Sequence, residues 1–274
     1  MKQATTTVVS GPSLIGAVAT GSAVEQKQRV KTYWEREACG EIHADAPEGT
    51  PEFFSQVERR REELEPHIAR FADFEGARGK RLLEIGVGLG TDFVRFARAG
   101  ANATGVDLTE RAVGLVRRRL DVEGLETDLR VADAEALPFE DGSFDRVYSW
   151  GVLHHTPDTA RAVREAVRVL RPGGELCVML YARYSWVAYG FWVRHALLAG
   201  RPWRTLAAVL ARHMESEGTK AYTEHELRQM FGGLTDLEID KVVTAYDFQL
   251  AGPLARLTGD RLGWQFVIRG RKPS

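Results

Sequence analysis

Between about residues 80 and 180, short apolar runs alternate with longer stretches whose apolar residues recur at helical spacing. The apolar runs predict strands and the stretches between them predict helices. We expect strands at Leu82–Ile85, Ala103–Val106, Asp128–Val131, Phe144–Ser149 and Glu175–Leu180, and helices at Thr91–Arg98, Glu110–Glu123 and Thr159–Leu170. Repeated units of this kind predict an α/β fold with a mostly parallel sheet, helices on both faces, and ligands at the carboxyl ends of the strands.

The chain before this region changes character once. Residues 1–24 are Thr, Ser, Gly, Ala and Val with almost no charge, which predicts a flexible tail; an export signal is a weaker alternative because Gly and Pro interrupt its apolar stretch. Residues 25–79 predict an N-terminal helical lid with helices at Glu25–Ala38 and Glu52–Phe74. Pro66 is expected to kink or split the second of these.

The third region, residues 80–274, predicts a core that a helical insertion interrupts at about 182–222. The insertion contains the aromatic run Tyr184–Leu198, which is too short to span a membrane. A capping-box pattern opens a helix at Thr223–Phe231. Leu237–Val243 and Gln265–Ile268 predict two closing strands, antiparallel because the turn-rich stretch between them does not suggest a crossover helix.

The charge balance and the cysteine content limit which binding partners and which cellular setting are expected. Lys and Arg number 37 against 38 Asp and Glu, for a net charge of -1, which argues against a nucleic-acid partner. The two cysteines, Cys39 and Cys177, lie far apart and form no disulfide framework or metal motif. A reducing, cytoplasmic setting without stable membrane insertion is therefore expected.

The candidate ligand site begins with a glycine loop after the first predicted strand. Glu84 precedes Gly86, Gly88 and Gly90, and glycines there let the backbone turn tightly and approach a ligand. The GxGxG spacing differs from the GxGxxG of dinucleotide-binding oxidoreductases, so an NAD-dependent enzyme is disfavoured. An acidic residue before the loop can meet an ammonium group or organise the loop, and a tight turn without a ligand is the alternative.

Two further acidic residues end the next two strands. Asp107 is placed to accept hydrogen bonds from ribose hydroxyls, unless it serves only as a helix cap, a task that Thr109 already suits. Asp133 can accept a hydrogen bond from an adenine amine, with the Ala134 N–H beside it, unless it only caps its loop.

Five segments in this order resemble the class I S-adenosylmethionine-dependent methyltransferases, in particular the group that modifies quinones and natural products: LLEIGVGLG, GVDLT, VADAEALPFEDGSFDRVYS, GVLHH and LRPGGEL. The resemblance covers about residues 80–180 and implies a Rossmann-like, seven-stranded sheet that binds S-adenosylmethionine. It implies that the methionine part contacts Glu84, Gly86, Gly88 and Gly90. Ribose would contact Asp107, and adenine would contact Leu108, Asp133 and Ala134. Ser149 or Trp150 would line the sulfonium end.

The resemblance also places residues near the transferred methyl group. Lys31–Glu35 is similar to the lid helix of this group, with Tyr33 contacting the cofactor, or else packing with Trp34 on the core. His155 or His154 follows the fourth strand and can take a proton from the acceptor, since histidine titrates near neutral pH. The pair recurs in the family whatever the acceptor, so a purely structural role is the alternative. No metal is predicted, because the histidines lack ligand spacing and a sulfonium needs none.

The sequence therefore predicts methyl transfer to an O, N or C atom of a small molecule, a hydrophobic or aromatic secondary metabolite. The aromatic residues of the insertion are candidates for its pocket, or for packing or the contact of a homodimer. Two alternatives stay open: a methyltransferase for peptide or protein side chains, and a cofactor-binding relative that regulates or catalyses a different step such as cyclisation.

Overall fold

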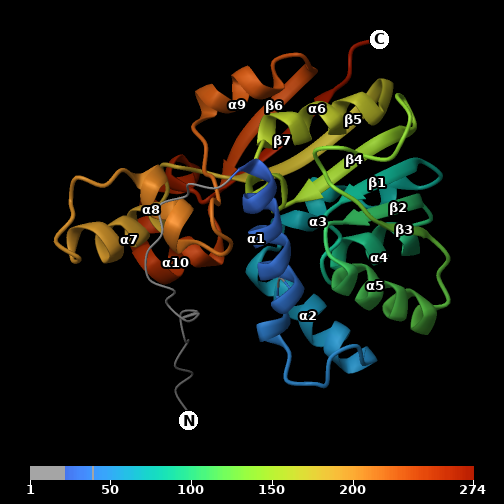
Figure 1. Ribbon diagram of the computed structural model, residues 1–274, viewed down its shortest axis with the longest axis horizontal. Helices are drawn as coiled ribbons and strands as arrows, with labels where there is room; N and C mark the ends of the chain where they lie inside the picture. The colour runs from blue at the N-terminus through green and yellow to red at the C-terminus, as the bar shows by residue number, and fades with distance from the viewer. Residues whose placement is uncertain (1–21, 39) are drawn as a thin grey trace.

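A computed structural model describes residues 22–38 and 40–274, in which a seven-stranded sheet has the order β3-β2-β1-β4-β5-β7-β6 (Figure 1). All its neighbours are parallel except β7, which is antiparallel to both β5 and β6. The fold class and the antiparallel closing pair are confirmed. The strands are β1 Arg81–Ile85, β2 Asn102–Asp107, β3 Asp128–Val131, β4 Phe144–Trp150, β5 Leu170–Tyr181, β6 Thr235–Val242 and β7 Gln265–Arg271.

Helices cover both faces of the sheet because its central strands are apolar on both sides. In β1, Leu82 packs in the apolar cluster beneath α4 (Thr91–Arg98) and α5 (Glu110–Glu123), whereas Leu83 packs in the cluster beneath α6 (Thr159–Val169) and α9 (Glu224–Phe231). Alternate residues of a strand point to opposite faces, so each buried strand contributes to both clusters. The expected capping box of α9 is present between Thr223 and Glu226.

The N-terminal helices are α1 (Ala23–Arg36), α2 (Pro51–Leu64) and α3 (His67–Ala72). The predicted second helix is split at Pro66, as its missing N–H and ring demand. A short 3-10 turn, Glu41–His43, lies between α1 and α2. Of the predicted tail, residues 1–21 lie outside the described residues, and Ser22 caps α1 in a capping box with Glu25.

The segment 182–222 leaves the sheet and returns to the same point. Its ends pair through a bridge between Ala182 and Tyr222, and it holds α7 (Trp186–Trp192), a π-helix (Val193–Leu197) and α8 (Leu206–His213). The turn-rich stretch between β6 and β7 contains short helices that the sequence pattern did not predict: α10 (Ala245–Ala251), α11 (Pro253–Thr258) and a final 3-10 turn, Gly259–Leu262.

These helices do not form a crossover, because they return the chain to an antiparallel strand. They pack with α7 and α8 in a lobe beside the sheet (Figure 1). These helices were not predicted from the sequence, because Gly252, Pro253 and Gly259 are typical of turns and here separate short helical segments. In the described part of the chain, no helix combines the length and the apolar character needed to cross a bilayer.

Candidate active site

The glycine loop lies between the end of β1 and the start of α4. Gly86, Gly88 and Gly90 have φ angles of 81°, 52° and 73°, in the left-handed region that favours glycine. A Cβ on Gly86 would overlap Val152, and one on Gly90 would lie 2.9 Å from a methyl group of Val116. A Cβ on Gly88 would meet nothing within 4 Å. Gly88 therefore borders open space, where a ligand can approach the backbone.

Glu84 lies just before this loop and is 3% exposed. Its Oε2 is buried and has no hydrogen-bond partner among the described residues. Burial raises the pKa of Glu84 well above its usual range, and the neighbouring Asp92 adds to that shift while Arg61 opposes it. A buried carboxylate oxygen without a donor is costly unless a ligand supplies one. The residue thus fits a cationic group such as an ammonium.

Asp107, at the end of β2, holds the glycine loop in place. Its Oδ2 accepts a hydrogen bond from the Gly88 N–H at 3.1 Å, and its Oδ1 accepts from the Thr109 N–H at 2.9 Å and hydroxyl at 2.8 Å. Burial raises the pKa of Asp107, and these hydrogen bonds oppose the shift. Because a carboxylate offers about four acceptor positions, one position on Oδ2 is left for a ligand. Leu108 beside it is half-buried.

Asp133, after β3, is engaged by the N-terminal helix. Its Oδ2 accepts a hydrogen bond from Lys27 Nζ at 2.5 Å, and its Oδ1 accepts from the Glu135 N–H at 2.9 Å. Lys27 also pairs with Glu135 Oε2 at 2.7 Å. Ala134 is 8% exposed and packs in the cluster beneath α6. The carboxylate predicted to face adenine therefore has a protein partner in this structure.

Helix α1 runs across the carboxyl ends of several strands (Figure 1). Glu35 accepts hydrogen bonds from the N–H groups of Glu110 and Arg111, both at 3.1 Å, at the start of α5. Arg29 pairs with Glu217 of the 182–222 segment at 2.9 Å. Together with Lys27, these residues fix α1 over the loops that follow β2 and β3, and join it to the insertion.

The ring of Tyr33 on α1 is half-buried and lies edge-on to Trp34, with centroids 4.9 Å apart. Trp34 in turn lies edge-on to His155, at 5.2 Å. The aromatic side of α1 therefore covers the loop after β4. Lys27 was not identified from the sequence, and Glu35 was included only as the end of Lys31–Glu35, which came from the resemblance. The available signal was their spacing of eight residues, about two helical turns.

The last residues of β4 differ in what they offer. Ser149 is fully buried, and its hydroxyl donates to the Ile85 carbonyl at 2.9 Å, so it links β4 to β1. Trp150 is 8% exposed, and its indole N–H has no hydrogen-bond partner among the described residues. Its ring packs between His67 and Phe71, with centroids 5.4 and 5.6 Å away.

His154 and His155 form a 3-10 turn after β4, and both side chains are buried. His155 Nδ1 lies 2.8 Å from Ser216 Oγ and 3.0 Å from Thr219 Oγ1. The hydroxyl of Thr219 donates to the Ser216 carbonyl at 2.6 Å, so Thr219 Oγ1 can only accept from Nδ1, whereas Ser216 Oγ can either donate to Nδ1 or accept from it. His155 Nε2 then faces Glu215 Oε2 at 3.3 Å.

His154 has no hydrogen-bond partner on either ring nitrogen among the described residues. Burial lowers its pKa well below the usual value, and the positive charges of His155 and Lys220 act in the same direction, so His154 is neutral at physiological pH. Glu215 and Ser216 belong to the loop after α8. In the sequence, Ser216 lies 61 positions from His155. No motif in the sequence connected that loop to the histidines.

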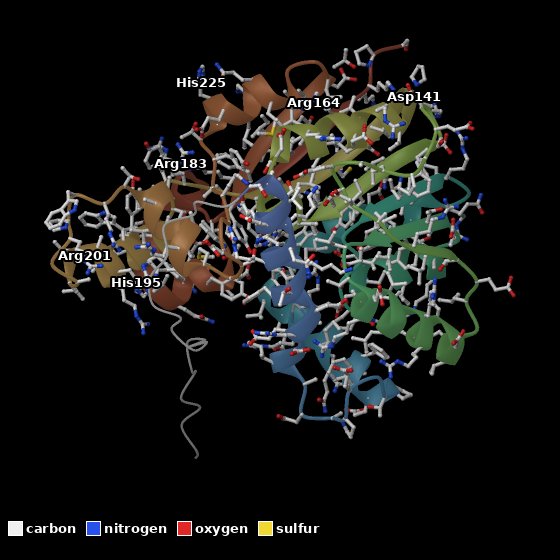
Figure 2. All side chains as sticks on the ribbon, in the orientation of Figure 1. Asp141, Arg164, Arg183, His195, Arg201 and His225 are labelled. Atoms are coloured by element: carbon white, nitrogen blue, oxygen red, sulfur yellow. The ribbon has the colours of Figure 1, made fainter. Side chains whose placement is uncertain are left out.

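The aromatic insertion is largely engaged in its own packing. The indole N–H of Trp186 donates to Thr258 Oγ1 at 2.9 Å, and that of Trp192 donates to the Arg204 carbonyl at 2.7 Å. Arg183, at the start of the insertion, donates to the Ala221 carbonyl at 3.1 Å and to Glu226 at 2.9 Å. Figure 2 shows Arg183 where the lobe meets the rest of the molecule.

Residues 83–178 match the family model described as "Methyltransferase domain". The chain is 40% identical over 102 residues to a ubiquinone biosynthesis O-methyltransferase of Aromatoleum aromaticum, covering 37% of this chain and 44% of the relative. It is 42% identical over 105 residues to the 27-O-demethylrifamycin SV methyltransferase of Amycolatopsis mediterranei, covering 36% and 38%.

Among solved structures, the crystal structure of the [4+2]-cyclase SpnF aligns with a TM-score of 0.54 at 20% identity, over 92% of this chain and 93% of that one. This likeness extends the shared fold beyond the matched segment to nearly the whole chain. The alignments with the two curated relatives span less than half of those proteins' lengths.

Proposed function

Because residues 83–178 belong to the class I S-adenosylmethionine-dependent methyltransferase family, we propose that this protein transfers a methyl group from S-adenosylmethionine to a hydrophobic or aromatic small molecule. One structural observation carries the proposal: Gly88, which borders open space, lies in the loop after Glu84, whose buried Oε2 has no partner in the described part of the chain. A cationic amino-acid group fits this pair, and the relatives named for quinone and rifamycin methylation support the acceptor class.

Each residue of the edge then has a distinct task. Glu84 accepts from the ligand's ammonium, the backbone at Gly86, Gly88 and Gly90 forms its cradle, and the remaining position on Asp107 accepts from a ribose hydroxyl. Adenine contacts are assigned to Leu108, Asp133 and the Ala134 N–H. Asp133 can accept from an adenine amine only by sharing or releasing Lys27, since the two are 2.5 Å apart.

The bound cofactor supplies an already activated methyl group on a sulfonium. The protein therefore has to position the acceptor and exclude water. Tyr33 and Trp34 on α1 cover the loop after β4, and Trp150 closes the strand end. His155 is the proposed proton acceptor, since its Nδ1 hydrogen bonds fix the ring and its Nε2 bears the lone pair when the ring is neutral.

The acceptor and the oligomeric state belong to the same proposal. The lobe keeps exposed apolar side chains at Tyr184, Leu198, Trp203 and Leu257. Such side chains suit either an apolar acceptor or a second copy of the chain. Sedimentation of the full chain, with and without Trp203→Ser, distinguishes these: self-association that the substitution abolishes identifies a homodimer contact.

The fold shared with a [4+2]-cyclase favours one second candidate, a cofactor-binding protein that catalyses a non-methylating step. Incubation with S-adenosylmethionine labelled on the methyl group, and a panel of quinol, polyketide and peptide acceptors, separates the readings. Label in a quinol or polyketide supports the proposal, and label in peptides alone would replace its acceptor class. Calorimetric binding without any labelled product favours the second candidate, and absence of binding overturns both.

A further inference from the structure

The histidine turn after β4 and the loop after α8 bring three side chains with metal-binding atoms together. One ring nitrogen each from His154 and His155 and a carboxylate oxygen of Glu215 all lie within 4.8 Å of one another. We propose that these three residues bind a divalent first-row transition metal ion such as Zn²⁺. This departs from the expectation of no metal, which considered the histidines without Glu215.

The hydrogen-bond pattern leaves a place for a cation between His155 and Glu215. When His155 is neutral and carries its proton on Nδ1, Nε2 has a lone pair and lies 3.3 Å from a carboxylate oxygen of Glu215. Two lone pairs at that distance repel unless a proton or a metal ion lies between them. Metal-binding histidines commonly donate their other N–H to a nearby acceptor, and Ser216 and Thr219 place hydroxyl oxygens beside His155 Nδ1.

His154 supplies the second, independent observation. It is fully buried, yet neither ring nitrogen has a hydrogen-bond partner among the described residues. A proton between His155 and Glu215 would satisfy those two residues and leave His154 unexplained, because burying an unpaired polar group costs free energy. A metal ion would take a lone pair from each of the two imidazoles, so it would engage His155 and one of the two ring nitrogens of His154.

The geometry is close to that of a loaded site. Ligand atoms about 2.0–2.1 Å from a tetrahedral ion lie roughly 3.4 Å apart, and the Nε2 to Oε2 distance of 3.3 Å already matches. The other separations are at most 4.8 Å, so ligand atoms would move together by up to about 1.4 Å to reach the ideal geometry. Of the three side chains, that of Glu215 is the freest to move, because it is 35% exposed and lies in a loop.

The charges and donor types around the cluster select the ion. Two nitrogen donors and one carboxylate favour Zn²⁺ and its transition-metal neighbours over Mg²⁺ or Ca²⁺, which prefer oxygen. Glu215 supplies the negative charge, and Tyr181 donates its hydroxyl to that carboxylate at 3.1 Å. Lys220 opposes a cation, but its ammonium donates to the Thr156 carbonyl at 2.5 Å.

A catalytic role for the ion rests on the proposed function. Three protein ligands leave a coordination position for an oxygen of the acceptor, and coordination lowers that oxygen's pKa. The acceptor's proton would then pass to solvent water, because His155 Nε2 would be occupied as a ligand. His155 would thus act as a base only in the metal-free protein and as a ligand once the ion is bound.

Metal binding is testable without any acceptor. Tag-free protein, stripped with a chelator, is titrated with Zn²⁺ in a calorimeter and with Co²⁺ in a visible spectrometer. We expect one ion per chain, with affinity lowered at least 10-fold by His155→Ala and by Glu215→Gln, the latter an isosteric change of a side chain that is 35% exposed. His213→Ala is the matched control, because it removes one ring of the second histidine pair, His195 and His213, stacked at 4.1 Å.

Retained Zn²⁺ binding in Glu215→Gln and His155→Ala, or its loss in His213→Ala, overturns the proposal, as does the absence of binding by the wild type. Binding of S-adenosylmethionine to the metal-free protein is measured in parallel. If that binding fails while Zn²⁺ binds as expected, the proposed function falls and the metal site stands. If S-adenosylmethionine binds and Zn²⁺ does not, the reverse holds.

Discussion

Replacing Asp107 by Ala tests the ribose contact most directly. Three of about four acceptor positions on its carboxylate are taken by Gly88 and Thr109. The structure therefore offers one clean hydrogen bond to a ribose hydroxyl, and a second only if the Thr109 hydroxyl gives way. Each charge-assisted bond is worth about 1.5 kcal/mol or more. We expect the dissociation constant of S-adenosylmethionine to rise by about 10-fold for one bond and about 150-fold for two.

The assay is calorimetric titration of S-adenosylmethionine and S-adenosylhomocysteine into wild type and variant. Asp128→Ala is the matched control, since this exposed acid at the start of β3 pairs only with its neighbour Arg130 among the contacts described. Urea unfolding checks that the loss of partners for Gly88 and Thr109 has not unfolded the loop. A change below about 3-fold, less than half of one such bond's free energy, would remove Asp107 from the ribose role.

Three further predictions follow from the same edge and from the lobe. Gly88→Ala should cost about 1–2 kcal/mol of unfolding free energy for its left-handed backbone and weaken cofactor binding, whereas Gly86→Ala should cost more because its methyl group overlaps Val152; urea unfolding and calorimetry check both. Lys27→Met should speed amide exchange in residues 23–36 by up to about fivefold per ion pair lost, with β1 unchanged. Burial, aided by His195 and nearby arginines, lowers the pKa of His213 to about 4. Below about pH 6.5 the unfolded chain binds a proton at His213 that the folded protein does not bind, so the free energy of unfolding falls as the pH drops from 6.5 to about 4. Urea denaturation midpoints of His213→Gln should fall less than those of the wild type over that pH range.

The sheet was predictable because its strands are strongly apolar and its helices start with clear caps. Thr109, Asp158 and Thr223 each cap the helix that follows, and such caps can be read from sequence. The helices between β6 and β7 were missed for a physical reason. Their seven- and six-residue lengths give too few turns for a periodic pattern, and packing against α7 stabilises them rather than intrinsic propensity.

The candidate site was predictable only where a polar residue lies at the end of an apolar strand. Glu84 and Asp107 lie at the ends of β1 and β2, so their positions alone indicated a role in ligand binding. Glu215 could not be found this way, because it reaches His155 through the fold of a long insertion. Lys27 was hidden for a related reason: its partners Asp133 and Glu135 lie 106 and 108 positions away, and a single charged residue on a helix reads as solvated.

Under the proposed function, the contacts of α1 would link cofactor binding to closure of the site. Lys27 holds the carboxylate that an adenine amine would use, Glu35 caps the helix that starts beside Asp107, and Trp34 covers His155. One helix thus contacts the loops assigned to adenine, ribose and the reacting end. A ligand whose adenine displaces Lys27 from Asp133 leaves the lysine its second partner, Glu135, at 2.7 Å. Closure over a bound ligand then costs one ion pair rather than two, so α1 can remain in place while Asp133 changes partners.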